Sequence, residues 1–138
     1  MSSKKQKEAT NKVGNKAFGI QRLTNSIKYS FEGLDYAYHG EQSTRMHALS
    51  FVIVVIIGFL LRISFNQWAL VVLSSMFILS IELINTAIEA IVDMYTTKFN
   101  PLAKIAKDCG SAAAFIASLA HIAICLFVFG DKLISIIG

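Results

Sequence analysis

Three long runs of apolar residues fill most of the chain after residue 46. They cover about 47–62, 68–95 and 101–130, with short polar segments between them. A helix needs about 20 mainly apolar residues to cross a hydrocarbon layer of about 30 Å; the first run is barely long enough and the other two are longer. The pattern predicts an all-α membrane protein with three transmembrane helices.

A different pattern precedes the first run. From Phe18 onward, apolar residues recur at steps of three and four while polar residues fill the opposite face, which is typical of an amphipathic helix over about 17–39. Such a helix suits the membrane interface, although packing as a lid on the transmembrane bundle would need the same pattern. We expect residues 1–16, rich in Lys, Ser and Asn, to form a disordered basic cytoplasmic tail before a single membrane domain over 17–138.

Composition and charge agree with this prediction. The 138 residues are 54% hydrophobic and 16% charged, which is unusual for a soluble domain. The net charge of +4 could suggest nucleic acid, but the cations concentrate in the N-terminal segment and around 98–107, at the flanks of the apolar runs. Anionic headgroups and the positive-inside rule explain that distribution, so we expect no nucleic-acid partner, a cytoplasmic N-terminus and connection 96–108, and an external C-terminus.

The second run carries a polar stripe. At about 100° per residue, Glu82, Asn85, Glu89 and Asp93 fall within roughly 80° of one helix face. An ionisable group at bilayer depth costs at least about 2.5–3.5 kcal/mol, so Glu82 needs a partner, a proton or a chemical role. The alternative is a cytoplasmic helix end with solvated acids, which fits Asp93 better than Glu82.

The third run has its own signals. Its only proline, Pro101, suits the first turn of a helix, so we expect the third helix to begin there. Gly110, Ala114 and Ser118 follow at four-residue spacing, which lets another helix approach closely. His121 is expected to be a hydrogen-bonded structural group rather than a metal ligand.

The polar residues indicate chemistry at the inner membrane face. Glu41 and Glu89 offer the hard oxygen ligands that suit Mg²⁺, and the three lysines within 98–107 offer point charges for a polyphosphate. The less solvated Glu82 could act as a general base toward a group buried in lipid. A small proton-linked transporter or channel subunit is the alternative of a different class, because intramembrane acids also form proton relays.

Segments 82–93 and 106–113 resemble the signature of the prokaryotic diacylglycerol kinase family, small integral-membrane lipid kinases. The resemblance extends from about Arg22 through the third run. It implies ATP as co-substrate, Mg²⁺ as cofactor, a lipid substrate, and a homotrimer with sites shared between subunits in a bacterial cell membrane.

The resemblance also implies roles for individual residues. Glu82 would take the proton from the lipid hydroxyl, Asn85 would position the reacting groups, and Glu41 and Glu89 would hold the Mg²⁺ of Mg-ATP. Ser111 would lie near the substrate. The remaining nucleotide-binding positions would be Arg22, Tyr29, Lys98, Phe99, Asn100, Lys107 and Asp108.

Two positions bear on the substrate. Asp35 and His47 stand where the diacylglycerol-specific branch has Arg and Glu. Pro-Leu-Ala-Lys at 101–104, before Ala-Lys-Asp, is similar to the Gram-positive branch, which phosphorylates undecaprenol. The resemblance therefore favours undecaprenol kinase, forming undecaprenyl phosphate, over diacylglycerol kinase, forming phosphatidic acid.

Overall fold

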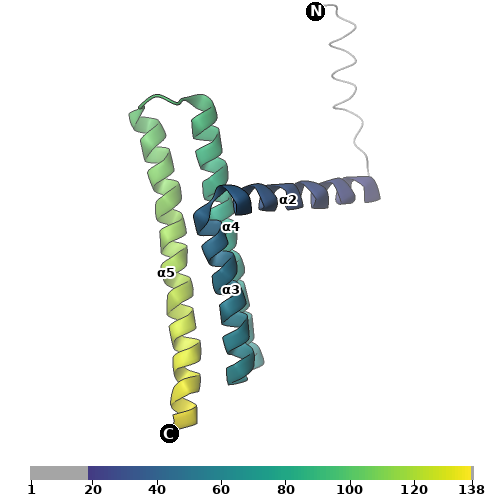
Figure 1. Cartoon of the computed structure of the whole chain (residues 1–138), viewed down its shortest axis with the longest axis vertical. Helices are drawn as coiled ribbons and strands as arrows, with labels where there is room; N and C mark the ends of the chain where they lie inside the picture. The colour runs from purple at the N-terminus through teal and green to yellow at the C-terminus, as the bar shows by residue number, and fades with distance from the viewer. Residues whose placement is uncertain (1–18, 138) are drawn as a thin grey trace, which may run out of the picture. The chain divides into compact units, whose positions relative to one another are not determined.

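The computed structural model describes residues 19–137, without the side chains of the last two. Across these residues the chain forms four helices, α2 (Ile20–Gly40), α3 (Gln42–Leu61), α4 (Phe65–Tyr95) and α5 (Pro101–Ile137) (Figure 1). Three of them, α3, α4 and α5, are long and apolar enough to cross a membrane. The all-α prediction with three candidate spans is confirmed, whereas the expected tail over 1–16 lies outside the described residues.

The chain divides into two compact units. The first contains the described residues up to Asp35, and the second runs from Tyr36 onward. The division falls within α2, a helix in which Ala37 is buried and the other residues are exposed. Its start at Ile20 agrees with the helix expected from the spacing of apolar residues before the first run.

The α3–α4 turn is built by local backbone chemistry. Helix α3 ends at Leu61, and the next residue, Arg62, caps it in a left-handed conformation with φ 51°. Ser64 then caps α4, because its hydroxyl accepts from the backbone N–H of Gln67 while the Gln67 side chain accepts from the Ser64 N–H. Helix α4 consequently begins at Phe65, three residues before the predicted start at 68.

The α4–α5 turn is closed by a side-chain cap. The Asn100 side-chain oxygen accepts from the backbone N–H groups of Leu102 and Ala103, at 2.9 and 3.3 Å. The predicted helix start at Pro101 is confirmed. The predicted end near 130 is too early, because α5 continues to Ile137.

Helix α3 also differs from the prediction. It begins at Gln42, five residues before the expected 47, so the polar segment that leads into the first apolar run is helical. Ser43 and His47 therefore lie one turn apart, on the same face of α3.

In the second unit, α4 runs antiparallel to both α3 and α5 (Figure 1). Helix α5 runs along α4, and α3 contacts both (Figure 1). A small apolar core contains Val54, Ile63, Val71 and Val128. Most large apolar side chains of the three helices are exposed on the outside of this unit, as expected where lipid or another subunit covers them.

Candidate functional site

Glu82 is a buried carboxylate held by α3. It is only 5% exposed. The Ser43 hydroxyl donates to its Oε2 at 3.0 Å, and His47 Nε2 lies 3.2 Å from its Oε1. Each carboxylate oxygen thus has a polar partner, as expected for an acid buried at this position in the helix.

One turn further along α4, Asn85 lies between Glu89 and Gly110. Its side-chain N–H donates to Glu89 Oε1 at 3.0 Å. Its Oδ1 is buried and, among the described residues, has no hydrogen-bond partner. A Cβ at Gly110 would lie 2.3 Å from that oxygen, so the glycine allows α5 to approach α4 here. The predicted close approach at Gly110 is confirmed.

A groove of about 430 Å³ lies at the α4–α5 turn. Five of the predicted nucleotide-binding residues line it, namely Lys98, Phe99, Asn100, Lys107 and Asp108. Sequence reasoning assigned no such role to Asp93, Thr96 and Thr97, which also line the groove. One indication of this role was visible in the sequence, namely that these residues lie in or beside the polar connection 96–108.

Two of the three lysines that line this groove, Lys104 and Lys107, are paired with carboxylates. Lys107 Nζ donates to Asp93 Oδ1 at 2.6 Å, and Lys104 pairs with Asp108. Asp93 has an exposed side chain, so the solvated-acid alternative describes Asp93 but not Glu82. Phosphate oxygens accept charge-assisted hydrogen bonds from lysine, as these carboxylates do.

Other predicted residues lie elsewhere. Glu41 is half-buried at the N-cap of α3, where its side chain makes no capping hydrogen bond. Arg22 and Tyr29 are exposed on the α2 segment of the first unit, and Ser111 is exposed on α5.

One chain gathers only part of the predicted constellation. Of the residues that the structure describes, those lining the groove include neither Glu41, Glu82 nor Glu89. Within the same residues, no group of three His, Cys, Asp or Glu side chains is placed to hold a metal ion. A metal here would need additional ligands, from a nucleotide or another subunit.

A second polar cluster lies within the helix bundle. His121 Nδ1 is 2.9 Å from the Ser74 hydroxyl, which also donates to the Val71 carbonyl at 3.0 Å. The expected hydrogen-bonded role of His121 is confirmed. Sequence reasoning missed its neighbour Cys125, whose sulfur lies 3.7 Å from Nε2, although the two residues are one turn apart.

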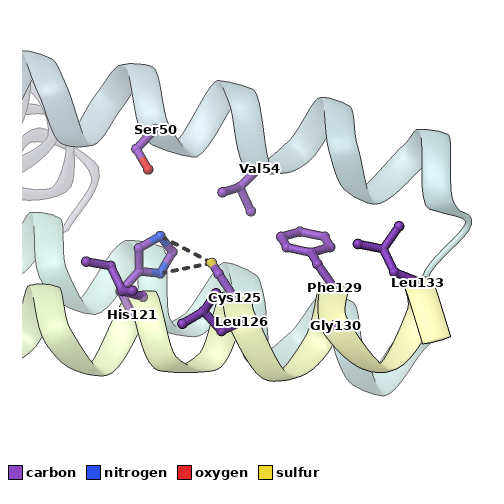
Figure 2. Close-up of a pocket in the computed structure, with 9 residues that line it drawn as sticks. Ser50, Val54, His121, Cys125, Leu126, Phe129, Gly130 and Leu133 are labelled. Carbon is purple, nitrogen blue, oxygen red and sulfur yellow. Dashed lines mark hydrogen bonds between the residues drawn. The ribbon is translucent and has the colours of Figure 1, made fainter.

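His121 and Cys125 border a largely apolar cavity of about 340 Å³. Figure 2 shows Ser50 and Val54 of α3 facing these two residues of α5. Phe129 continues the same wall of the cavity toward the C-terminal end of α5.

Comparison with known proteins identifies the family. Residues 28–129 match the family described as prokaryotic diacylglycerol kinase. The chain is 40% identical over 99 residues to a diacylglycerol kinase of Pseudomonas aeruginosa, covering 72% of this chain and 80% of that protein. It is 34% identical over 114 residues to an undecaprenol kinase of Bacillus subtilis, covering 83% and 93%. A diacylglycerol kinase of Escherichia coli is 32% identical over 105 residues, covering 76% and 86%. The chain therefore belongs to the prokaryotic diacylglycerol kinase family, a family of lipid kinases.

Proposed function

We propose that this lipid kinase transfers the γ-phosphate of Mg-ATP to the hydroxyl of undecaprenol, giving undecaprenyl phosphate. The observation that carries the proposal is Glu82, a carboxylate only 5% exposed on a helix long enough to span a membrane. A base at that depth can reach a hydroxyl group that a lipid presents from within the bilayer.

Glu82 takes the hydroxyl proton as the lipid oxygen attacks the γ-phosphorus and ADP leaves. The base is needed because an alcohol oxygen is a weak nucleophile until its proton is removed. Asn85, one turn away and hydrogen-bonded to Glu89, positions the reacting groups. Phosphoryl transfer otherwise depends mainly on positioning and on stabilising negative charge.

The groove at the α4–α5 turn binds the nucleotide. Lys98 and Lys107 face the phosphates, and Phe99, 84% exposed, offers an apolar surface to the base. When a phosphate binds, the Lys107 amine either leaves Asp93 or contacts both Asp93 and the phosphate. Asn100 contributes through the turn that it caps, because its side-chain oxygen is already engaged with the α5 backbone. Arg22, Tyr29 and Asp108 complete the nucleotide contacts, and Ser111 lies near the lipid.

Glu41 and Glu89 fit the requirements of Mg²⁺. The Glu41 carboxylate is not used for capping, and Glu89 is half-buried with one oxygen bonded to Asn85. Mg²⁺ commonly takes one or two carboxylates together with substrate phosphates. Bound there, the ion would neutralise negative charge on the phosphates.

The active enzyme is a homotrimer with shared sites. In one chain the described residues that line the groove include neither Glu41, Glu82 nor Glu89. A neighbouring subunit can supply what a single chain does not gather, which supports this arrangement. The exposed apolar side chains of α3, α4 and α5 provide surface for subunit and lipid contacts.

The protein resides in a bacterial cell membrane with its N-terminus and active site on the cytoplasmic side. The lysines at the α4–α5 turn support that orientation. The exposed apolar residues of α2, including Ile20, Leu23 and Phe31, support its placement in the membrane interface as an amphipathic helix. Residues 17–138 then form one membrane domain after a disordered basic tail.

Undecaprenol and diacylglycerol are the two candidate acceptors. Three features favour undecaprenol. They are the similarity to the Bacillus subtilis undecaprenol kinase, which covers 93% of that protein, the residue His47, and the segment 101–104. The 40% identity to the Pseudomonas aeruginosa diacylglycerol kinase favours diacylglycerol.

A direct assay separates these acceptors. The purified protein, in detergent micelles with γ-labelled ATP and Mg²⁺, receives either lipid at equal mole fraction. We expect label in extracted undecaprenyl phosphate at a kcat/KM at least tenfold above that for diacylglycerol. Preferential labelling of phosphatidic acid would assign the second acceptor, and no label in either lipid would refute the kinase proposal. A Glu82→Gln sample serves as the blank.

A further inference from the structure

The contact between α3 and Glu82 involves two residues that have no assigned role. Ser43 and His47 lie one turn apart on α3, and each contacts a different oxygen of the Glu82 carboxylate, at 3.0 and 3.2 Å. The side chains of His47 and Glu82 are 20% and 7% exposed, so water screens their interaction poorly.

From this geometry we infer that His47 and Ser43 are positioning residues that fix the orientation of Glu82 for proton abstraction. The inference rests on the proposed function, in which Glu82 is the base. Ser43 donates a hydrogen bond to Oε2, and His47 Nε2 lies within hydrogen-bond distance of Oε1. A general base must present an oxygen to the proton that it removes, so two fixed contacts on the carboxylate favour proton transfer in one geometry.

The two contacts also fix the orientation of the Glu82 carboxylate. With one carboxylate oxygen bound to each α3 side chain, rotation of the Glu82 carboxyl group would break both interactions. A carboxylate oxygen has two lone pairs, so each can still receive a substrate proton while keeping its α3 partner.

Other titratable groups near this pair are few among the described residues. On α4 the charged group facing His47 is Glu82 itself. On α5, His121 lies within electrostatic range of His47, with its own ring bonded to Ser74. On α3, Arg45 is directed to the backbone carbonyls of Tyr38 and His39.

The test is the steady-state kinetics of lipid phosphorylation, measured with saturating Mg-ATP. His47→Ala removes the contact at Glu82 Oε1, so kcat should fall about tenfold as the carboxylate loses its fixed orientation. The KM for ATP should stay within about twofold, because His47 does not line the nucleotide groove. His47→Gln keeps a hydrogen-bond donor and should restore most of the lost kcat.

Two controls match these changes. His39→Ala makes the same replacement in the last turn of α2 and should leave kcat unchanged. Ser43→Ala removes the contact at Glu82 Oε2 and should lower kcat as His47→Ala does, whereas Ser80→Ala should not, since the Ser80 hydroxyl bonds its own helix at the Met76 carbonyl.

The outcomes separate this inference from the proposed function. If Glu82→Gln abolishes turnover while His47→Ala leaves kcat unchanged, Glu82 remains the base and the role of His47 is refuted. A kcat that stays low in His47→Gln refutes the role of the hydrogen bond. If Glu82→Gln itself keeps nearly full turnover, the proposed function fails first.

Discussion

Replacing Gly110 by alanine tests whether the close approach of α4 and α5 supports the site. The added Cβ would lie 2.3 Å from Asn85 Oδ1 and 3.4 Å from Asn85 Cγ. The Asn85 side chain must move by roughly 1 Å to reach ordinary van der Waals separation, and its hydrogen bond to Glu89 would be strained or lost. Overpacking of this kind costs about 1–3 kcal/mol.

The helix propensity of alanine works in the opposite direction. A Gly→Ala change inside a helix gains up to about 1 kcal/mol, so the net loss for Gly110→Ala is about 0–2 kcal/mol. Gly130→Ala provides the matched control, because a Cβ at that α5 position meets nothing within 4 Å. The difference between the two variants, about 1–3 kcal/mol, isolates the contact with Asn85.

Thermal unfolding in detergent and steady-state kinetics measure the two consequences. We expect a lower Tm for Gly110→Ala than for Gly130→Ala, and a kcat reduced about tenfold in Gly110→Ala alone, since Asn85 is displaced from its position beside Glu89. Equal Tm and kcat in the two variants would refute the view that Gly110 holds Asn85 in place.

Three further predictions concern the proposed roles. Glu82→Gln should lower kcat by about 10²–10⁴ while the affinity for ATP stays near normal, and nearly full turnover would exclude Glu82 as the base. Glu41→Gln and Glu89→Gln should each weaken Mg-ATP binding, with the Glu89 defect partly offset by more Mg²⁺; an unchanged Mg²⁺ titration in both would remove them from the metal site. Co-assembly of the inactive Glu41→Gln and Glu82→Gln chains should restore part of the activity if the two residues of one site belong to different subunits. If verified mixed oligomers recover no activity, the two residues of one site are not divided between subunits in this way.

The helices were predictable from residue spacing, but their ends were not placed equally well. Pro101 marks the start of α5 because its ring suits the first turn of a helix. The start of α4 was placed too late because the reciprocal cap between Ser64 and Gln67 was overlooked, although its spacing is visible in the sequence. The start of α3 was placed too late, near 47, because the residues after Glu41 are mostly polar. In the structure Ser43 and His47 of this helix contact the buried Glu82 of α4.

The sequence predicted the part of the candidate site that lies on a single helix, but not the contacts between helices. The period of an α-helix places Glu82, Asn85, Glu89 and Asp93 on one face of α4. It does not tell which neighbouring helix faces each of them, since this depends on how α3 and α5 rotate and slide when they pack. The contact between His47 and Glu82 joins residues 35 positions apart, and no local pattern indicates it.

Burial separates the acids of α4 into different chemical roles. Asp93 is exposed and held by Lys107 in a groove that water reaches, so its charge needs no special environment. Glu89 is half-buried and bonded to Asn85, with an oxygen still available to a cation. Glu82 is buried, and both of its oxygens contact α3. From Asp93 to Glu82 the stripe covers about 16 Å at 1.5 Å per residue. It therefore offers a charged end suited to phosphates and a sheltered end suited to a lipid hydroxyl, which is the division that a kinase acting on a membrane lipid requires.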